Sequence, residues 1–253
     1  MEKNLDGIRE VIRGNDNIVL VSGSEVTRES GMNGVRAEHM VYDIEQKYGY
    51  SGEEIMTEQF FTRQVEVFYD YYKDVVLGAR EPSLTTVYRA AAELEKRGKL
   101  TDIVTRMVYD SYREAGCDHV IMLYGTVEDN KCPSCGKTFG SKYIRESKHV
   151  PKCDDCQLIL RPGFSLFGEM LDNARLTKAC NAIEYANVLL VVGTHLNSLT
   201  WQSMLRYYGG DKLILINTRE NVGDERANYR AYGNISEIFG YITDYNELER
   251  QRG

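Results

Sequence analysis

The sequence predicts an α/β fold: a Rossmann-like parallel sheet with helices on both faces, plus a small zinc-ribbon domain. Two observations carry this prediction. Short, continuous apolar segments alternate with helical patterns, which is typical of strands that are buried on both faces of a parallel sheet. Four of the six cysteines form two Cys-x-x-Cys pairs in one stretch of the chain, which is the pattern of a zinc site.

The composition is that of a globular protein with one large domain, or one large and one small. The chain has 253 residues, of which 42% are hydrophobic and 27% charged, so it can bury a substantial core. A net charge of −7 makes nucleic acid an unlikely partner. The first residues are charged and amphipathic, and no apolar run is long enough to span a membrane. We therefore expect a cytoplasmic protein without a membrane partner.

The first strand and the turn after it organise the predicted fold. Residues 5–13 have apolar positions at helical spacing, and four apolar residues at 18–21 begin a strand expected at 18–22. The strand runs into Ser22-Gly23-Ser24, and a stretch compatible with a helix follows. Turns of this kind hold phosphate groups, because backbone N–H groups and a helix N-terminus point at the anion.

Helices and strands then alternate to the end of the chain. Residues 37–76 have an unusually aromatic helical pattern, which we interpret as core or groove wall rather than a cofactor site. Pro82 and Ser83 are expected to start a further helix that Gly98 ends. Another helix is expected at 176–185, and strands are expected at 102–105, 119–124, 188–192 and 212–217.

Polar residues and glycines follow the ends of these strands. Because the carboxyl ends of parallel strands meet at one edge of a sheet, ligands bind there, at the switch in strand order. The residues expected at this edge are Ser22, Gly23, Ser24, Thr105, Tyr124, Gly125, Gly193, Thr194 and Asn217.

The two cysteine pairs predict a structural zinc ion. Cys132 and Cys135 are separated from Cys153 and Cys156 by a spacing found in zinc ribbons. Four thiolates make a closed tetrahedral shell without a position for water. A redox dithiol or free thiols are the alternative. We expect the zinc-binding small domain at 126–163, inserted into a large domain of residues 1–125 and 164–253, with part of 37–77 as a candidate helical module.

In this order the motifs resemble those of the sirtuins, NAD-dependent protein deacylases with a Rossmann-type large domain and a small zinc-binding domain. The resemblance spans nearly the whole chain. Residues 22–36, SGSEVTRESGMNGVR, are similar to the family's GAGIS…SGIPDFR loop, and residues 160–169, LRPGFSLFGE, are similar to LRPDVVxFGE. GTHL at 193–196 resembles GTSL, and Asn217 follows a strand as in INxE. The resemblance implies cofactor-binding roles for Ser22, Gly23, Ser24, Thr27, Arg36, Gly193, Thr194 and Asn217.

The departures from the family pattern lie at the positions that carry its chemistry. The catalytic histidine of the family's His-Gly pair corresponds to Tyr124, and tyrosine has an ordinary pKa near 10 against about 6.5 for histidine. The TQNID motif, whose Asn and Asp bind the nicotinamide carboxamide, reads Thr105 to Tyr109, with Met107 and Tyr109 at those two positions. We therefore assign no catalytic residue.

The phosphate loop departs from the pattern as well. Its third small residue is Glu25, and a carboxylate about 4 Å from a phosphate charge repels it by roughly 4 kcal/mol at an effective dielectric constant near 20. NAD is therefore a doubtful cofactor. We expect Arg36 or Arg106 to pair with Glu25, and a salt bridge to Arg28 is an alternative. The Pro-Asp-Phe of the loop is replaced by Asn33, Gly34 and Val35.

Three functional hypotheses follow. The first is a sirtuin-like binding or regulatory module, not a competent lysine deacylase, whose ligand is an unidentified protein or nucleotide. The second is an enzyme on the same scaffold that consumes NAD or another nucleotide, by NAD hydrolysis or ADP-ribosyl transfer, with Glu25, His39, Tyr124 and His195 as candidate polar groups. The third is deacylation by an unusual base.

Overall fold

Six parallel strands form one sheet in the computed structural model, which describes residues 2–32, 40–78, 83–197 and 199–252. The strand order is β3-β2-β1-β6-β7-β8, so the order switches between β1 and β6. The bounds are β1 (Ile18–Ser22), β2 (Leu100–Thr105), β3 (Val120–Met122), β6 (Val188–Val192), β7 (Leu213–Asn217) and β8 (Tyr229–Tyr232). The predicted parallel α/β sheet is confirmed.

Helices cover both faces of the sheet because the buried strands alternate their side chains between two cores. Ile18 and Leu20 belong to core A, which they share with helices α1, α7 and α12. Val19 and Val21 belong to core B, on the face of α10 and α11. The helices of this domain are α1 (Glu2–Arg13), α2 (Ser24–Glu29), α7 (Thr86–Lys96), α8 (Ser111–Glu114), α10 (Asn173–Tyr185), α11 (Leu199–Leu205), the short 3-10 helix η3 (Asp224–Arg226), α12 (Ile235–Ile242) and α13 (Tyr245–Arg252).

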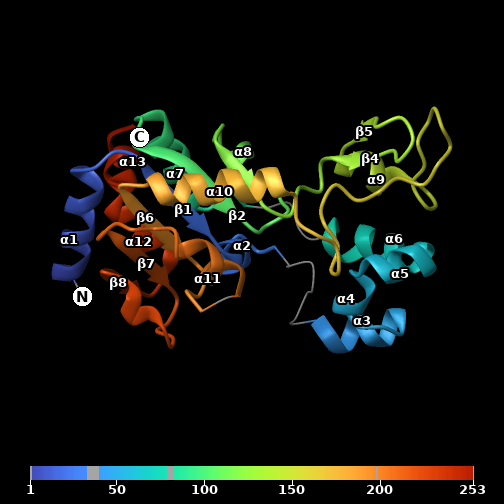
Figure 1. The fold of residues 1–253 in the computed structure, drawn as a ribbon, viewed down its shortest axis with the longest axis horizontal. Helices are drawn as coiled ribbons and strands as arrows, with labels where there is room; N and C mark the ends of the chain where they lie inside the picture. The colour runs from blue at the N-terminus through green and yellow to red at the C-terminus, as the bar shows by residue number, and fades with distance from the viewer. Residues whose placement is uncertain (1, 33–39, 79–82, 198, 253) are drawn as a thin grey trace.

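A smaller part of the molecule lies beside the sheet, to the right in Figure 1. It contains a helical group, lower in the view, and a two-stranded ribbon above it. The helical group is α3 (Val41–Tyr48), α4 (Gly52–Ile55), α5 (Glu58–Arg63), α6 (Val65–Tyr71) and the π-helix η2 (Tyr72–Val76); the ribbon is β4 (Asn130–Lys131), β5 (Thr138–Phe139) and α9 (Ser141–Glu146). The two groups share core C, in which the rings of Phe68 and Tyr72 pack near Cys132 and Cys153.

The aromatic region at 37–76 is therefore core, as expected, within its described part. Tyr69 and Tyr72 are buried, and their hydroxyls find partners in the ribbon segment: Tyr69 bonds the Leu160 carbonyl and Tyr72 bonds the Asn130 side chain. The helical group and the ribbon thus depend on each other for burial. The domain boundaries at 126 and 163 stay a prediction.

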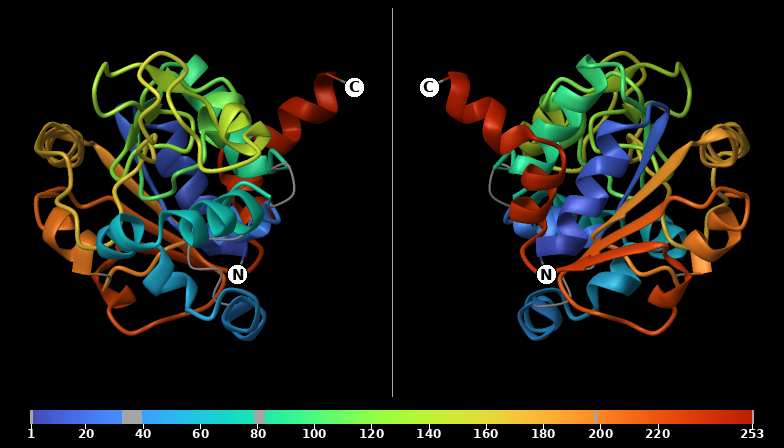
Figure 2. Two further views of the ribbon diagram at one scale, coloured as in Figure 1. Left: turned by 90° about the vertical axis from the view of Figure 1, so that its right-hand side faces the viewer. Right: turned by 90° about the vertical axis from the view of Figure 1, so that its left-hand side faces the viewer.

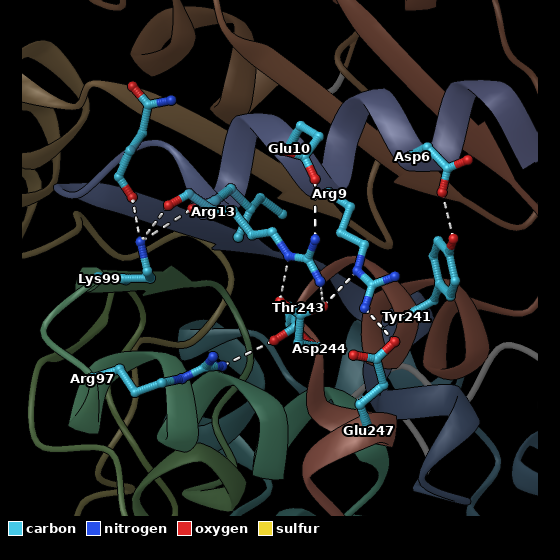
Figure 3. A network of polar contacts seen from close by, with 12 residues as sticks. Asp6, Arg9, Glu10, Arg13, Arg97, Lys99, Tyr241, Thr243, Asp244 and Glu247 are labelled. Atoms are coloured by element: carbon cyan, nitrogen blue, oxygen red, sulfur yellow. Dashed lines mark hydrogen bonds and ion pairs between the residues drawn. The ribbon is translucent and has the colours of Figure 1, made fainter.

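An ion-pair network joins the first helix to the last two, on the outside of core A (Figure 3). Asp244, in the connection between α12 and α13, accepts from Arg9 and from Arg13 on α1. Arg9 also pairs with Glu247 on α13, and Tyr241 donates to Asp6. Figure 2 shows α13 at the edge of the molecule, where this network and the buried Tyr245 ring in core A attach it.

Some predicted elements differ in extent. The strand predicted at 119–124 ends at Met122, because Leu123 and Tyr124 form a turn in which Gly125 has φ +90°. The helix expected from Pro82–Ser83 begins at Thr86, with Thr85 as its N-cap; Pro82 lies outside the described residues. In the part of the chain that is described, no helix has both the length and the apolar character needed to cross a membrane.

Candidate ligand crevice and metal centre

Two glycines bring the carboxyl ends of β1 and β6 into close contact at the switch point. Gly23 donates its N–H to the Val192 carbonyl, and a side chain at Gly23 would lie 2.3 Å from the Gly193 oxygen and from the Thr194 side chain. Gly193 has φ +65°, and a side chain there would press on the backbone of Val26. Both glycines are needed for the fold of the loop, whatever the crevice binds.

The predicted cofactor residues on β1 and α2 are largely engaged inside the protein. Ser22 is buried, and its hydroxyl accepts a 2.7 Å hydrogen bond from Tyr112. Thr27 is also buried, and its carbonyl accepts from Ser30. Ser24 is half-buried at the start of α2. Arg36 and His39, which were candidates from the sequence, lie outside the described residues.

A chain of polar contacts runs along the carboxyl ends of β6 and β7. Asn217 is fully buried, and its amide nitrogen donates to the Thr194 carbonyl at 3.3 Å and lies 3.2 Å from Nδ1 of His195. The amide oxygen of Asn217 accepts from the backbone N–H of Thr218. Asn217 therefore holds the His195 ring in place. A single histidine in a loop often has such a structural hydrogen bond.

Glu25 completes this polar chain from the opposite side of the switch point. Its Oε2 accepts a 2.9 Å hydrogen bond from the Thr218 hydroxyl and a longer one from the Thr218 N–H. Thr218 was not singled out from the sequence, although a polar residue directly after a strand end is the signal that would have found it. Glu25 thus extends over the carboxyl end of β7.

The expected arginine pairing of Glu25 is not what the described residues show. Their contacts to the Glu25 carboxylate come from Thr218, which supplies neutral donors rather than a charge. Arg106 lies over the ring of Trp201, with its guanidinium carbon 5.7 Å from the ring centre. The pairing with Arg106 is therefore wrong, and Arg36 cannot be placed.

Tyr124 lies in the turn between the sheet and the smaller part of the molecule. Its half-buried ring packs against both core B and core C, and its carbonyl accepts from Ser165 at 2.7 Å. Within the described ranges its hydroxyl has no hydrogen-bond partner. Gly125, which follows, pairs with Phe164, where an added side chain would meet the Gly163 oxygen at 2.3 Å. The tyrosine is held in place mainly through its backbone and ring.

The segment after β2 carries no carboxamide clamp. Tyr109 is buried, and its hydroxyl donates to the Val76 carbonyl in core C. Burial raises the pKa of Tyr109 well above its ordinary value, so this residue stays neutral. Met107 is tied to the strand end by its N–H, which donates to the Thr105 hydroxyl. Trp201 is fully buried beneath Arg106, and its indole N–H has no acceptor among the described residues.

The four predicted zinc ligands lie together in the ribbon. The sulfur atoms of Cys132, Cys135, Cys153 and Cys156 are all within 4.8 Å of one another. The Sγ atoms of Cys135 and Cys153 are 3.8 Å apart. A tetrahedral shell with bonds of about 2.3 Å requires about 3.8 Å between its sulfur atoms. The cluster therefore fits a structural zinc ion and leaves no side for substrate.

The surroundings of the cluster are those of two zinc knuckles. The Cys132 carbonyl accepts from Gly136, and the backbone N–H of Cys156 points at the Cys153 sulfur. Lys137 bridges to Asp154 and Asp155, which ties the two knuckles together. The two remaining cysteines lie elsewhere. Cys117 is buried and its pKa is raised by burial to about 12, as expected for an inert thiol, whereas Cys180 is only half-buried.

Known proteins share this arrangement. The model of the Sir2 family matches residues 23–199. An NAD-dependent protein deacetylase of Clostridium tetani is 34% identical over 239 residues, which cover 94% of this chain and 96% of that protein. A crystal structure of a Sir2 homolog in complex with NAD superposes with a TM-score of 0.79 at 29% identity, over 98% of this chain and 94% of that one.

A second similar structure is a Sir2 mutant with tyrosine in place of a histidine, solved with a p53 peptide and NAD. Its TM-score is 0.76 at 24% identity, over 96% of this chain and 99% of that chain.

Proposed function

This chain belongs to the Sir2 family, and from that premise we propose that it is a zinc-containing binding or regulatory module rather than a competent lysine deacylase. We also propose that it acts in the cytoplasm, with 126–163 as its zinc-binding small domain. The relatives are named NAD-dependent protein deacetylases. The proposal differs from their activity because of particular residues of this chain.

The observation that carries the proposal is Tyr124. The resemblance gives this position to the catalytic histidine. Among the described residues, His195 does not replace that histidine, because it is bound to Asn217. A base works best when its pKa lies near the working pH, and the ordinary pKa of tyrosine is more than three units above that of histidine. The two positions that clamp a carboxamide in the family offer no such group here, since Met107 has an apolar side chain and the Tyr109 hydroxyl is bonded to the Val76 carbonyl.

Glu25 is a reason to expect that NAD binds this chain weakly. Its carboxylate lies at the carboxyl end of β7, at the edge of the sheet where a pyrophosphate would be expected. Thr218 satisfies its hydrogen bonds without neutralising its charge, so repulsion between Glu25 and a phosphate group is expected to persist. Because NAD is the cosubstrate named for the relatives, weakened binding is a second reason to expect little turnover.

Peptide binding is the property we expect this chain to keep. The Sir2 mutant with tyrosine in place of a histidine was solved with both a peptide and NAD, so in that protein the substitution is compatible with binding. In this chain the segment after Tyr124 is paired with Phe164, and Phe167 is paired with Thr57. Gly163-Phe164-Ser165 stands where the peptide-binding strand of the family has Asp-Val-Val, and these pairings hold the backbone of this segment in place.

A second candidate function is an enzyme on the same scaffold that hydrolyses NAD, transfers ADP-ribose or deacylates by an unusual base. The close contact of Gly23 with Gly193 and the buried Asn217 favour it, because these retained features belong to the loop and ribose positions of the family. The candidate sites Ser22, Gly23, Ser24, Thr27, Arg36, Gly193, Thr194 and Asn217 would then bind the nucleotide.

NAD consumption separates the two functions. The zinc-loaded protein and its Tyr124→Phe variant are incubated with NAD, with and without an acyl-lysine peptide, and nicotinamide is quantified. Equal background in both proteins supports the binding module. Release by the wild type that Tyr124→Phe abolishes supports the enzyme and overturns the proposal.

A further inference from the structure

A cavity at the open edge of the sheet lies outside the ligand crevice. It has a volume of about 250 Å³ and is lined by all three residues of β3, by the turn at 125–126, and by side chains of α8 and α10. None of the described residues that line it belongs to the polar chain of Glu25, Thr218 and Asn217. We propose that this cavity binds a small molecule that carries a phosphate group, a role that goes beyond the function proposed above.

The charged side chains around the cavity are mostly cationic. Arg113 comes from α8, and Arg175 and Lys178 come from α10. Asp129 is the only carboxylate among the described residues that line the cavity. Arg113 pairs with Asp110 at 2.9 Å, so it contributes charge rather than free donors. Because the whole chain has a net charge of −7, this positive excess is local, and it favours an anion in the cavity.

The two cations of α10 are available to a ligand. Arg175 is half-buried, and Lys178 is exposed one turn further along the helix, so both side chains lie on the same face. No described residue forms an ion pair or a side-chain hydrogen bond with either of them. Asp172 acts electrostatically on Arg175, and Asp102 acts on Lys178, in both cases beyond ion-pair distance. An anion in the cavity would therefore find two cationic groups whose donors are unused.

The strand at the cavity wall adds backbone donors. β3 is the edge strand of the sheet within the described ranges, and across its pairing with β2 the Leu123 N–H donates to the Thr105 carbonyl. Neighbouring residues of a strand point their backbone groups to opposite sides, so those of Val120 and Met122 face the open edge. The Met122 carbonyl accepts from Gly125, whereas the two N–H groups have no partner in the described part of the chain. Sheet edges of this kind can form concave sites for anions.

The size of the cavity and its donors favour a phosphate group. A volume of about 250 Å³ corresponds to roughly eight water molecules at about 30 Å³ each, which is enough for phosphate or a small phosphate ester. It is below the roughly 300–1,000 Å³ of pockets that bind larger ligands, so a dinucleotide does not fit.

Arg175 is also positioned for this role. Its guanidinium lies against the turn, because a side chain at Gly125 would be 2.9 Å from Nη1 of Arg175. A guanidinium presents parallel donors that match phosphate oxygens, and the Lys178 ammonium adds a point charge to balance the second negative charge of a phosphate.

Calorimetric titration of the zinc-loaded protein tests this assignment, with inorganic phosphate, glycerol 3-phosphate and succinate as probes. We expect both phosphates to bind with dissociation constants of about 1 mM or below, and succinate to bind at least about tenfold more weakly. Arg175→Gln and Lys178→Gln should each weaken phosphate at least about fivefold. Asp129→Asn should strengthen it at least about twofold, because the substitution removes a like charge. Tighter binding of glycerol 3-phosphate than of inorganic phosphate assigns the site to esters, and equal binding assigns it to free phosphate.

Lys142→Gln on α9 is the matched control, since it removes one exposed cation that does not line the cavity. It should leave the phosphate affinity unchanged. Lys178 is exposed, so Lys178→Gln keeps the test decisive even if Arg175→Gln lowers the thermal unfolding midpoint. The inference is overturned when phosphate gives no heat of binding at roughly ten times the expected dissociation constant. It is equally overturned when succinate binds as tightly as phosphate, or when Lys178→Gln and Lys142→Gln bind phosphate equally well. The proposed loss of deacylation is tested separately, by turnover.

Discussion

Glu25 and Thr218 lie 193 residues apart in the chain and are joined by a 2.9 Å hydrogen bond from the Thr218 hydroxyl to the Glu25 carboxylate. The contact connects the helix after β1 to the end of β7, across the switch point of the sheet. It places a negative charge at the edge where a parallel sheet of this order binds its ligand. We therefore expect this side chain to influence which ligand binds.

Removing the Glu25 charge is expected to strengthen NAD binding. Glu25→Gln keeps an acceptor for Thr218, and Glu25→Gly restores the small residue of the family loop. Each should improve the dissociation constant for NAD at least tenfold, because tenfold corresponds to only about 1.4 kcal/mol of the repulsion. Glu29→Gln is the control, since Glu29 on the same helix accepts from Ser236 in a similar contact. Unchanged NAD affinity in both Glu25 variants would refute the role given to the carboxylate.

Restoring the base is expected to create some activity. A positioned base contributes about 100- to 10,000-fold to a rate. Tyr124→His should raise nicotinamide release with an acyl-lysine peptide at least about tenfold, a smaller gain because Met107 and Tyr109 still provide no carboxamide clamp. Tyr124→Phe should stay at the wild-type level. A Tyr124→His variant as inactive as wild type, with zinc content unchanged, would mean that the position is not the catalytic one.

Loss of the metal should unfold more than the ribbon. Cys153 contributes to core C, which also holds the aromatic rings of the helical group. We expect the wild-type protein to bind one zinc ion per chain, and Cys153→Ser or a chelator to remove it. Loss of zinc should lower the thermal unfolding midpoint and decrease the near-ultraviolet circular dichroism of the tyrosines. Cys180→Ser should retain both the zinc and the midpoint. A chelated protein with an unchanged tyrosine signal would show that core C does not depend on the metal.

The α1–α13 network predicts a pH-dependent contribution to stability. Burial alone would raise the pKa of Asp244, but hydrogen bonds from Arg13 and Arg9 hold it below the ordinary value of 3.8. The folded state then binds fewer protons than the unfolded state, so the contribution is full above pH 3.8 and is lost as the pH falls through the lower folded pKa.

Asp244→Asn measures this contribution directly. At neutral pH the variant should lose about 1–3 kcal/mol of unfolding free energy in urea, because Arg9 keeps a largely buried charge without its partner. The difference from wild type should shrink when both are measured below pH 3. Asp211→Asn, at an exposed pair with Lys212, should change stability by less than about 0.5 kcal/mol. Equal losses in the two variants would contradict the network's role.

The sheet could be predicted from the sequence wherever a strand is buried on both faces. Ile18–Ser22, Val188–Val192 and Leu213–Asn217 each contain a continuous apolar run, and all three are strands in which every residue is buried. β8 was not predicted, because Tyr229–Tyr232 at the edge of the sheet has only one buried residue and no apolar run. The clustering of the four cysteines was predicted from the sequence, since ligand spacing is itself the geometric signal.

The contacts of the crevice could be predicted only in part. Strand-end rules bring Gly23, Thr194 and Asn217 to one edge, but they do not say which side chain bonds which. Glu25 reaches Thr218 rather than an arginine because the α2 N-terminus points it across β6, an orientation that depends on the whole sheet. Tyr112, the partner of Ser22, comes from α8, and Trp201, the ring under Arg106, comes from α11; no pattern placed either helix.

Turnover of an acyl-lysine peptide by the wild-type protein tests the central claim most directly. The zinc-loaded protein is incubated with NAD and an acetyl-lysine peptide at neutral pH, next to the Clostridium tetani relative under the same conditions, and deacylated peptide is quantified by mass spectrometry. The account predicts product from the relative and none above the enzyme-free blank from this chain. Deacylated peptide formed together with nicotinamide by this chain would contradict it.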